Sequence, residues 1–222
     1  MRKYLWHAAT FWVAAYAAVL LWSVIAPKEY FTWMLESVPG LIAFLVLALT
    51  YKRFRFTPLA YILILVHCCI LFVGGHYTYA EVPLFDILKD WLHQTRNNYD
   101  KVGHFAQGFI PAIVGRELLI RHNVLARRGW LFPVVTAFCL AISAVYELIE
   151  WLAAASTGEA AEAFLGTQGY VWDTQSDMLV ALIGAIAAQL LLGRWHDAQI
   201  HTITWKSSEV PTPAPSKVGK GA

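Results

Sequence analysis

Six long apolar runs, separated by short polar segments, account for most of the first 192 residues. They cover about residues 7–25, 34–50, 57–74, 102–120, 130–153 and 178–192. At about 1.5 Å per helical residue, each run crosses most or all of the roughly 30 Å hydrocarbon layer of a membrane. The second run is the weakest, because Pro39 and Gly40 interrupt it and Glu36 lies near its start. Neighbouring helices can satisfy the backbone groups that proline frees, so this run is also expected to span.

Composition supports a membrane protein. Hydrophobic residues make up 58% of the chain and charged residues only 14%, whereas a water-soluble domain of this length needs more polar surface. The sequence therefore predicts an all-α, polytopic transmembrane helix bundle of about six membrane-spanning helices. The net charge of +2 indicates no nucleic-acid partner, and membrane lipids are the expected surroundings.

The distribution of lysine and arginine predicts the orientation, because these residues are enriched in cytoplasmic loops. A cytoplasmic N-terminus leaves only four of them outside, at Lys28, Lys89, Arg96 and Lys101. The other thirteen are then cytoplasmic: Arg2, Lys3, Lys52, Arg53, Arg55, Arg116, Arg121, Arg127, Arg128, Arg194, Lys206, Lys217 and Lys220. Six spans return the C-terminus to the cytoplasm, and the loops 75–101 and 154–176 are expected outside.

Two segments differ from the spans. Residues 78–99 have an apolar side and a polar side, which predicts a short amphipathic helix at the membrane interface and a lid over any site below it. After Leu192, Arg194, Trp195, His196 and Trp205 resemble an interfacial anchor, and a Pro/Ser/Thr-rich run follows. We therefore expect a six-helix transmembrane domain at 1–195 and a cytoplasmic anchor with a disordered tail at 196–222.

Ionisable residues gather at one end of the predicted bundle. Because consecutive helices alternate in direction, this outer end receives His76, Asp100, His104, Glu147, Glu150, Asp173 and Asp177. Spacings of three and four place Asp100 with His104, Glu147 with Glu150, and Asp173 with Asp177 on shared helix faces. Ionisable groups at the edge of the hydrocarbon layer are unfavourable, so a convergent set is a site hypothesis.

The same blocks resemble known bacterial membrane proteins. Asp100-Lys101-x-x-His104-Phe105, a glutamate on the next helix and Asp173-x-x-x-Asp177 resemble the VanZ-like proteins. The fuller pattern in 74–79, 96–104, 146–151 and 169–178 resembles the bacterial inner membrane protein YjdF family, over roughly residues 1 to 195. The resemblance implies an inner membrane location and, through the VanZ-like group, a loose link to cell-envelope chemistry. Glu150 stands where VanZ-like proteins tend to have glutamine, which makes this site more anionic.

Each residue also has a structural interpretation. Asp100, Asp173 and Asp177 are placed to cap helices or to favour their dipoles, and Glu147 and Glu150 are placed to lock helices together through histidine or lysine. Glu117, with Arg116 and Arg121 at the other end, has the pattern of a solvated ion pair at a helix edge.

The functional interpretation rests on the whole set, since like charges raise one another's pKa unless a cation intervenes. One hypothesis is a divalent metal (Zn, Mn or Mg) bound by His76, Asp100, His104, Glu150, Asp173 and Asp177, polarising a phosphate or ester of a lipid-linked envelope substrate. The other is metal-free acid and base catalysis, and in both the catalytic candidates are Glu147, Glu150 and His104. A proton- or cation-coupled transporter and a structural membrane factor are the alternatives.

Overall fold

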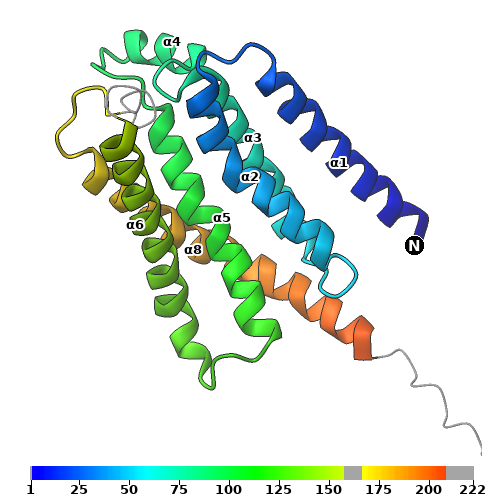
Figure 1. The fold of residues 1–222 in the computed structure, drawn as a ribbon. Coiled ribbons are helices and arrows are strands. Elements are labelled where there is room, and N and C mark those ends of the chain that lie inside the picture. The colour runs from blue at the N-terminus through cyan, green and yellow to red at the C-terminus, as the bar shows by residue number, and fades with distance from the viewer. Residues whose placement is uncertain (1, 158–166, 209–222) are drawn as a thin grey trace, which may run out of the picture.

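The structure, a computed structural model, describes residues 2–157 and 167–208. This part of the chain contains only helices and connecting segments: α1 (Arg2–Val24), α2 (Tyr30–Thr50), α3 (Pro58–Tyr77), α4 (Pro83–Trp91), α5 (Tyr99–Arg121), a 3-10 turn at Arg128–Trp130, α6 (Leu131–Thr157) and α8 (Asp173–Ser208). The long helices α1, α2, α3, α5, α6 and α8 gather into one bundle, with short α4 across one end (Figure 1). The predicted all-α polytopic fold is confirmed.

Each of the six predicted spans falls on one of the long helices. In the described residues, α1, α2, α3, α6 and α8 are long and apolar enough to cross a membrane. Helix α5 has comparable length, 23 residues, but polar residues such as His104 and Gln107 make it less apolar than these five helices. Twelve of its residues are buried, because α5 packs against α3, α6 and α8. Its polar groups therefore face other helices, where ionisable residues in membranes are normally found.

The helices alternate in direction as expected. The C-terminal ends of α1, α3 and α6 and the N-terminal ends of α2, α5 and α8 lie at the end of the bundle that also carries α4 (Figure 1). The predicted interfacial helix is present as α4, whose Leu84, Ile87 and Trp91 are exposed. No residue of α4 lines the cavity described below, so its predicted role as a lid is not seen.

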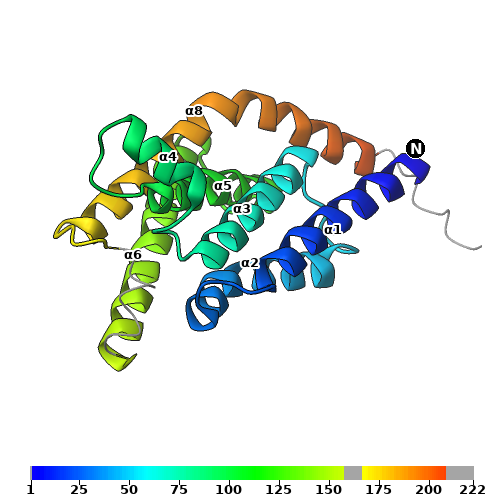
Figure 2. The ribbon, with the colours of Figure 1, turned by 90° about the horizontal axis from the view of Figure 1, so that it is seen from above.

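Helix α8 is much longer than the predicted span of 178–192. Its 36 residues correspond to about 54 Å, more than a bilayer core is thick. Seen from above, α8 runs obliquely across the bundle toward the N-terminus of α1 (Figure 2). The helix continues past Leu192 because it still has a buried side, which includes His196 and Ile200. The division of the chain at 195/196 stays a prediction, and the tail from residue 209 lies outside the described residues.

Two polar residues at the opposite end of the bundle were misinterpreted from the sequence. Glu117 is fully buried, and it accepts hydrogen bonds from the Thr57 backbone N–H at 2.9 Å and from Arg121 at 2.7 Å. His196, expected at the interface, is also fully buried, with Nε2 3.1 Å from a Glu117 oxygen. The ion pair is therefore not a solvated helix edge but a polar junction between the start of α3, the end of α5 and the middle of α8.

Helices α5 and α8 form the closest contact in the bundle. A side chain at Gly108 of α5 would overlap the Ala181 carbonyl, and one at Gly184 of α8 would overlap the Phe105 carbonyl. Small residues allow this approach of two backbones, as is common between helices in membranes. The contact holds the first turns of α5 and α8 side by side, and these turns carry the acidic residues of the outer end.

Candidate functional site

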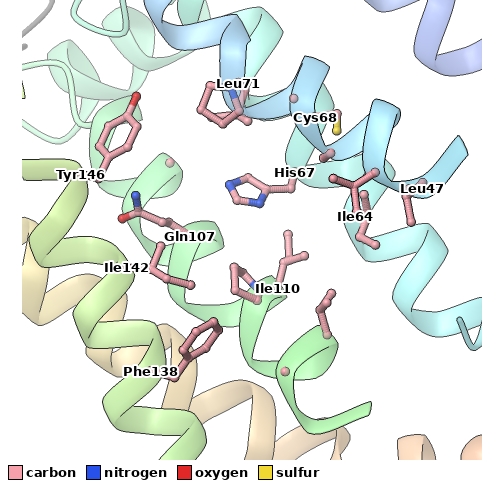
Figure 3. Close-up of a pocket in the computed structure, with 18 of the residues that line it drawn as sticks. Leu47, Ile64, His67, Cys68, Leu71, Gln107, Ile110, Phe138, Ile142 and Tyr146 are labelled. Atoms are coloured by element: carbon pink, nitrogen blue, oxygen red, sulfur yellow. The ribbon is translucent and has the colours of Figure 1, made fainter. Parts of the chain in front are cut away.

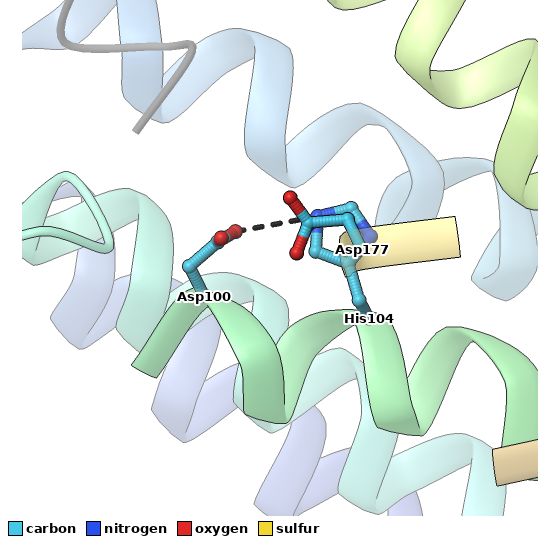
Figure 4. A group of neighbouring side chains, drawn as sticks. All are labelled: Asp100, His104 and Asp177. Carbon is cyan, nitrogen blue, oxygen red and sulfur yellow. Dashed lines mark ion pairs between the residues drawn. The ribbon is translucent and has the colours of Figure 1, made fainter. Parts of the chain in front are cut away.

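Asp100, His104 and Asp177 form the centre of a buried polar cluster. Asp100 and His104 occupy one face of α5, four residues apart, and Asp177 faces them from α8 (Figure 4). His104 Nε2 lies 3.3 Å from Asp100 Oδ1 and 3.7 Å from Asp177 Oδ1. The three side chains are 3–7% exposed, and one potential ligand atom from each lies within 4.8 Å of the others. The structure thus brings together three of the residues expected at a metal site.

Two basic side chains provide the positive charge that the aspartates require. Lys101 Nζ lies 2.5 Å from Asp177 Oδ1, 2.7 Å from Asp173 Oδ1 and 3.4 Å from Asp100 Oδ2. Arg96 also contacts Asp173, at 2.5 Å. These ion pairs explain how three aspartates can be buried together, since an unpaired buried charge is strongly unfavourable. They also show that Asp100 and Asp173 do more than cap helices.

The two glutamates of α6 have different surroundings. Glu147 Oε1 lies 3.8 Å from His104 Nδ1, on the side of the imidazole away from Asp100. Glu150 is 7% exposed and has no hydrogen bond or ion pair among the described residues, yet it lines the cavity beneath the cluster. The convergence of α5, α6 and α8 at this end agrees with the prediction, whereas the catalytic roles assigned to Glu147, Glu150 and His104 stay predictions.

His76 does not join the group. Its Nδ1 lies 3.0 Å from the Ser23 carbonyl oxygen, and its ring is 4.5 Å from the Trp22 ring. Both partners belong to α1, so the face of α3 that carries His76 is turned away from α5 and α8. Counting helix ends placed His76 at the correct level, but the sequence did not show which face it occupied.

Glu36, Tyr146 and Tyr79 extend the cluster toward α2. Glu36 is 4% exposed and accepts a hydrogen bond of 3.0 Å from the Tyr146 hydroxyl. Burial, and next the charge of Glu36, raise the pKa of Tyr79 well above its usual value, so its hydroxyl keeps its proton. Glu36 and Tyr146 were missed as site members, although one acidic residue within the otherwise apolar second span was a usable signal.

An interhelical cavity of about 620 Å³ begins at this cluster and runs along the bundle between α2, α3, α5 and α6. Glu36, Asp100, His104, Tyr146 and Glu150 line its outer end. Farther in, most lining side chains are apolar, and Figure 3 shows Leu47, Ile64, Ile110, Phe138 and Ile142 around the His67 ring. The volume is in the usual range for ligand sites, roughly 300–1,000 Å³. The polar cluster is therefore the head of a long apolar cavity.

Comparison with known proteins agrees with this architecture. Residues 8–198 match the family described as predicted membrane protein (DUF2238). The chain belongs to this family. It is also 47% identical, over 182 residues, to the inner membrane protein YjdF of Escherichia coli (strain K12), an alignment that covers 82% of this chain and 87% of that protein. No solved structure matches the chain significantly.

The match to DUF2238 includes every residue of the cluster, from Glu36 to Asp177. Together with the relative of known location, it establishes a multi-pass protein of the bacterial inner membrane. The family description names no reaction or ligand, so the chemistry of the site has to be argued from its geometry.

Replacing Lys101 by methionine tests the electrostatics of the cluster. The change leaves three aspartates without their shared cation, and we expect the free energy of unfolding to fall by about 3–5 kcal/mol. Lys89→Met is the matched control, because the ion pair of Lys89 with half-exposed Asp86, at 3.3 Å, should contribute at most about 1 kcal/mol. Adding Asp177→Asn to Lys101→Met should restore part of the loss. Denaturant unfolding in detergent micelles measures the stability of the two single variants and of the double variant. Equal losses for the two lysine variants would contradict the role of Lys101 as the cation of the aspartate cluster.

Proposed function

We propose that this DUF2238 protein acts on a lipid or lipid-linked substrate of the bacterial envelope by acid and base catalysis at His104. The observation that carries the proposal is a buried His104–Asp100 pair at the head of an apolar cavity within the membrane. A histidine held by a carboxylate is the commonest group for moving protons in enzymes. The cavity offers a place for hydrocarbon, while the cluster holds the polar part of the same molecule.

Each side chain has a distinct role in this proposal. Asp100 fixes the imidazole through Nε2, which leaves Nδ1, directed toward Gln107 and Glu147, to exchange a proton with the substrate. Glu147 balances the charge that appears on the ring when it accepts this proton. Glu150 contacts the substrate from the cavity wall. Lys101 and Arg96 lie behind this layer and hold Asp100, Asp173 and Asp177 in place.

A divalent metal at Asp100, His104 and Asp177 is the second candidate. One imidazole and two carboxylates, with ligand atoms within 4.8 Å of one another, form a donor set that suits zinc or manganese. A bound metal would supply Lewis acidity toward a phosphate or ester. The Lys101 ammonium already lies 2.5 Å from the Asp177 oxygen, so a metal would require Lys101 to turn toward Asp173. We therefore favour the metal-free version.

Transport of protons or cations is less well supported. A relay needs a series of polar groups that crosses the bundle, whereas the middle of the cavity is lined by apolar side chains and only one titratable imidazole, that of His67. A purely structural role does not explain why Glu150 is buried at the head of a cavity.

The catalytic proposal is tested on lipids. Extracts of cells that produce the wild type should differ from those of cells without it in at least one lipid or lipid-linked species, measured by liquid chromatography and mass spectrometry. His104→Ala and Glu147→Gln should reduce the effect about 100-fold or more at equal protein levels, the usual scale of acid and base catalysis. Glu81→Gln, at an exposed ion pair with Lys28, is the matched control. If His104→Ala changes the cellular lipids as strongly as the wild type does, the proposal is overturned. The metal version would be favoured if a chelator abolished the lipid change. It would also require zinc or manganese to be bound to the purified wild type but not to Asp177→Asn.

We also propose that the cluster faces the extracytoplasmic side, with both termini in the cytoplasm. The lysine and arginine distribution supports this orientation. In a variant without Cys68, Cys69 and Cys139, an impermeant maleimide should label Ala80→Cys in intact spheroplasts. It should label Arg127→Cys only after permeabilisation. The reverse pattern would move the site to the cytoplasmic side.

A further inference from the structure

The interhelical cavity is open to the lipid near its inner end, opposite the polar cluster. Val46 of α2, Leu118 of α5 and Phe138 of α6 line it, and they are 49%, 38% and 52% exposed. Large apolar side chains that line a cavity and also reach the surface of a membrane-spanning bundle mark an opening toward hydrocarbon. A ligand can therefore enter from the bilayer without passing through water.

The length of the cavity suits a hydrocarbon chain. On α2 its lining runs from Glu36 to Thr50, which is about 21 Å along the helix axis. Half of a bilayer core is about 15 Å thick. The apolar part is therefore long enough for the chain of a lipid whose head group lies at the polar cluster.

The head of the cavity carries two carboxyl groups that have no cationic partner among the described residues. Lys101 and Arg96 contact Asp100, Asp173 and Asp177, but neither is paired with Glu36 or Glu150. Glu36 and Glu150 are 4% and 7% exposed and both line the cavity. Glu36 accepts a hydrogen bond from the neutral Tyr146 hydroxyl, and among the described residues the Glu150 side chain has neither a hydrogen bond nor an ion pair. Two buried carboxyl groups, one on α2 and one on α6, therefore line the cavity with room for a hydrogen-bond donor between these helices.

We propose that this cavity binds a membrane lipid with a primary amine head group. The ammonium lies between Glu36 and Glu150 and donates hydrogen bonds to both carboxylates. One acyl chain lies along the apolar cavity between α2 and α6. The inference rests on the proposed function, whose substrate class it names.

Lipid binding to the delipidated full-length protein tests the inference without any turnover. The probes are phosphatidylethanolamine and phosphatidylglycerol with identical acyl chains, titrated in detergent and counted by native mass spectrometry. The wild type should bind the ethanolamine lipid about tenfold more tightly, because charge-assisted hydrogen bonds to the ammonium are absent with the glycerol head group. Glu36→Gln with Glu150→Gln should abolish this preference, whereas the exposed Glu81→Gln should keep it.

A second variant tests the position of the acyl chain in the cavity. Ala43 lies midway along the cavity on α2, and Ala43→Trp should block it and weaken binding of both lipids about tenfold or more. Equal affinities for the two lipids in the wild type, or a preference that survives the double glutamate change, would overturn the amine assignment. Displacement of the lipid by free ethanolamine at similar concentration would show a soluble amine as the ligand and would also overturn it.

His104→Ala separates this inference from the proposed function. The variant should keep the preference for the ethanolamine lipid within about threefold, since His104 is not one of the two ammonium ligands. If the wild type prefers the ethanolamine lipid but its production changes no cellular lipid, the catalytic proposal alone is refuted. If production of the wild type changes a cellular lipid but the protein does not prefer the ethanolamine lipid, this inference alone is refuted.

Discussion

The close contact between α5 and α8 is the constraint on which the outer cluster depends. Gly108 and Gly184 let the two backbones approach to a distance that any larger residue would prevent. The first turns of the helices consequently lie side by side, and Lys101 reaches both Asp173 and Asp177. Without this approach the aspartates would need other partners or would remain ionised at the edge of the hydrocarbon layer, where isolated charges are unfavourable. At the opposite end, Glu117 joins Thr57, Arg121 and His196 in the same way. The two ends of the α5–α8 pair are thus fixed by buried polar contacts that differ in composition.

The outer cluster has two layers with different electrostatic character. The layer between α5 and α8 is compensated, because Arg96 and Lys101 share the charge of three aspartates. The layer that faces the cavity contains His104 with Glu36 and Glu150, and no lysine or arginine of the described residues pairs with these glutamates. Asp100 belongs to both layers because it also lines the cavity, whereas the ion pairs of Asp173 and Asp177 with Lys101 lie behind the lining residues. In the proposed function, this second layer is the part of the site that meets the substrate.

Hydropathy and chain alternation were sufficient to predict the helices and the end of the bundle at which the acidic residues meet. Both depend on features that are local in the sequence: the length of an apolar run, and the reversal of direction at each loop. The errors concern which face of a helix a residue occupies. His76 was placed at the correct level, but its side chain lies against Ser23 and Trp22 of α1. His196 looked interfacial because hydropathy falls after Leu192, although tertiary contacts bury it against Glu117. Glu36 was noted only as a flaw in an apolar span, since its partner Tyr146 is 110 residues away.

Zero-length cross-linking between α5 and α8 tests the central contact most directly. A membrane-permeant carbodiimide joins an amine to a carboxylate only when the two are in contact, and Lys101 Nζ lies 2.5 Å from Asp177 Oδ1. After treatment of the protein in native membranes, peptide mass spectrometry should detect an isopeptide bond between Lys101 and Asp177 or Asp173. The link should be absent from Lys101→Arg. If Lys101 forms no link while the surface pair Lys89 and Asp86 does, the first turns of α5 and α8 are not in contact and the account of the site is wrong.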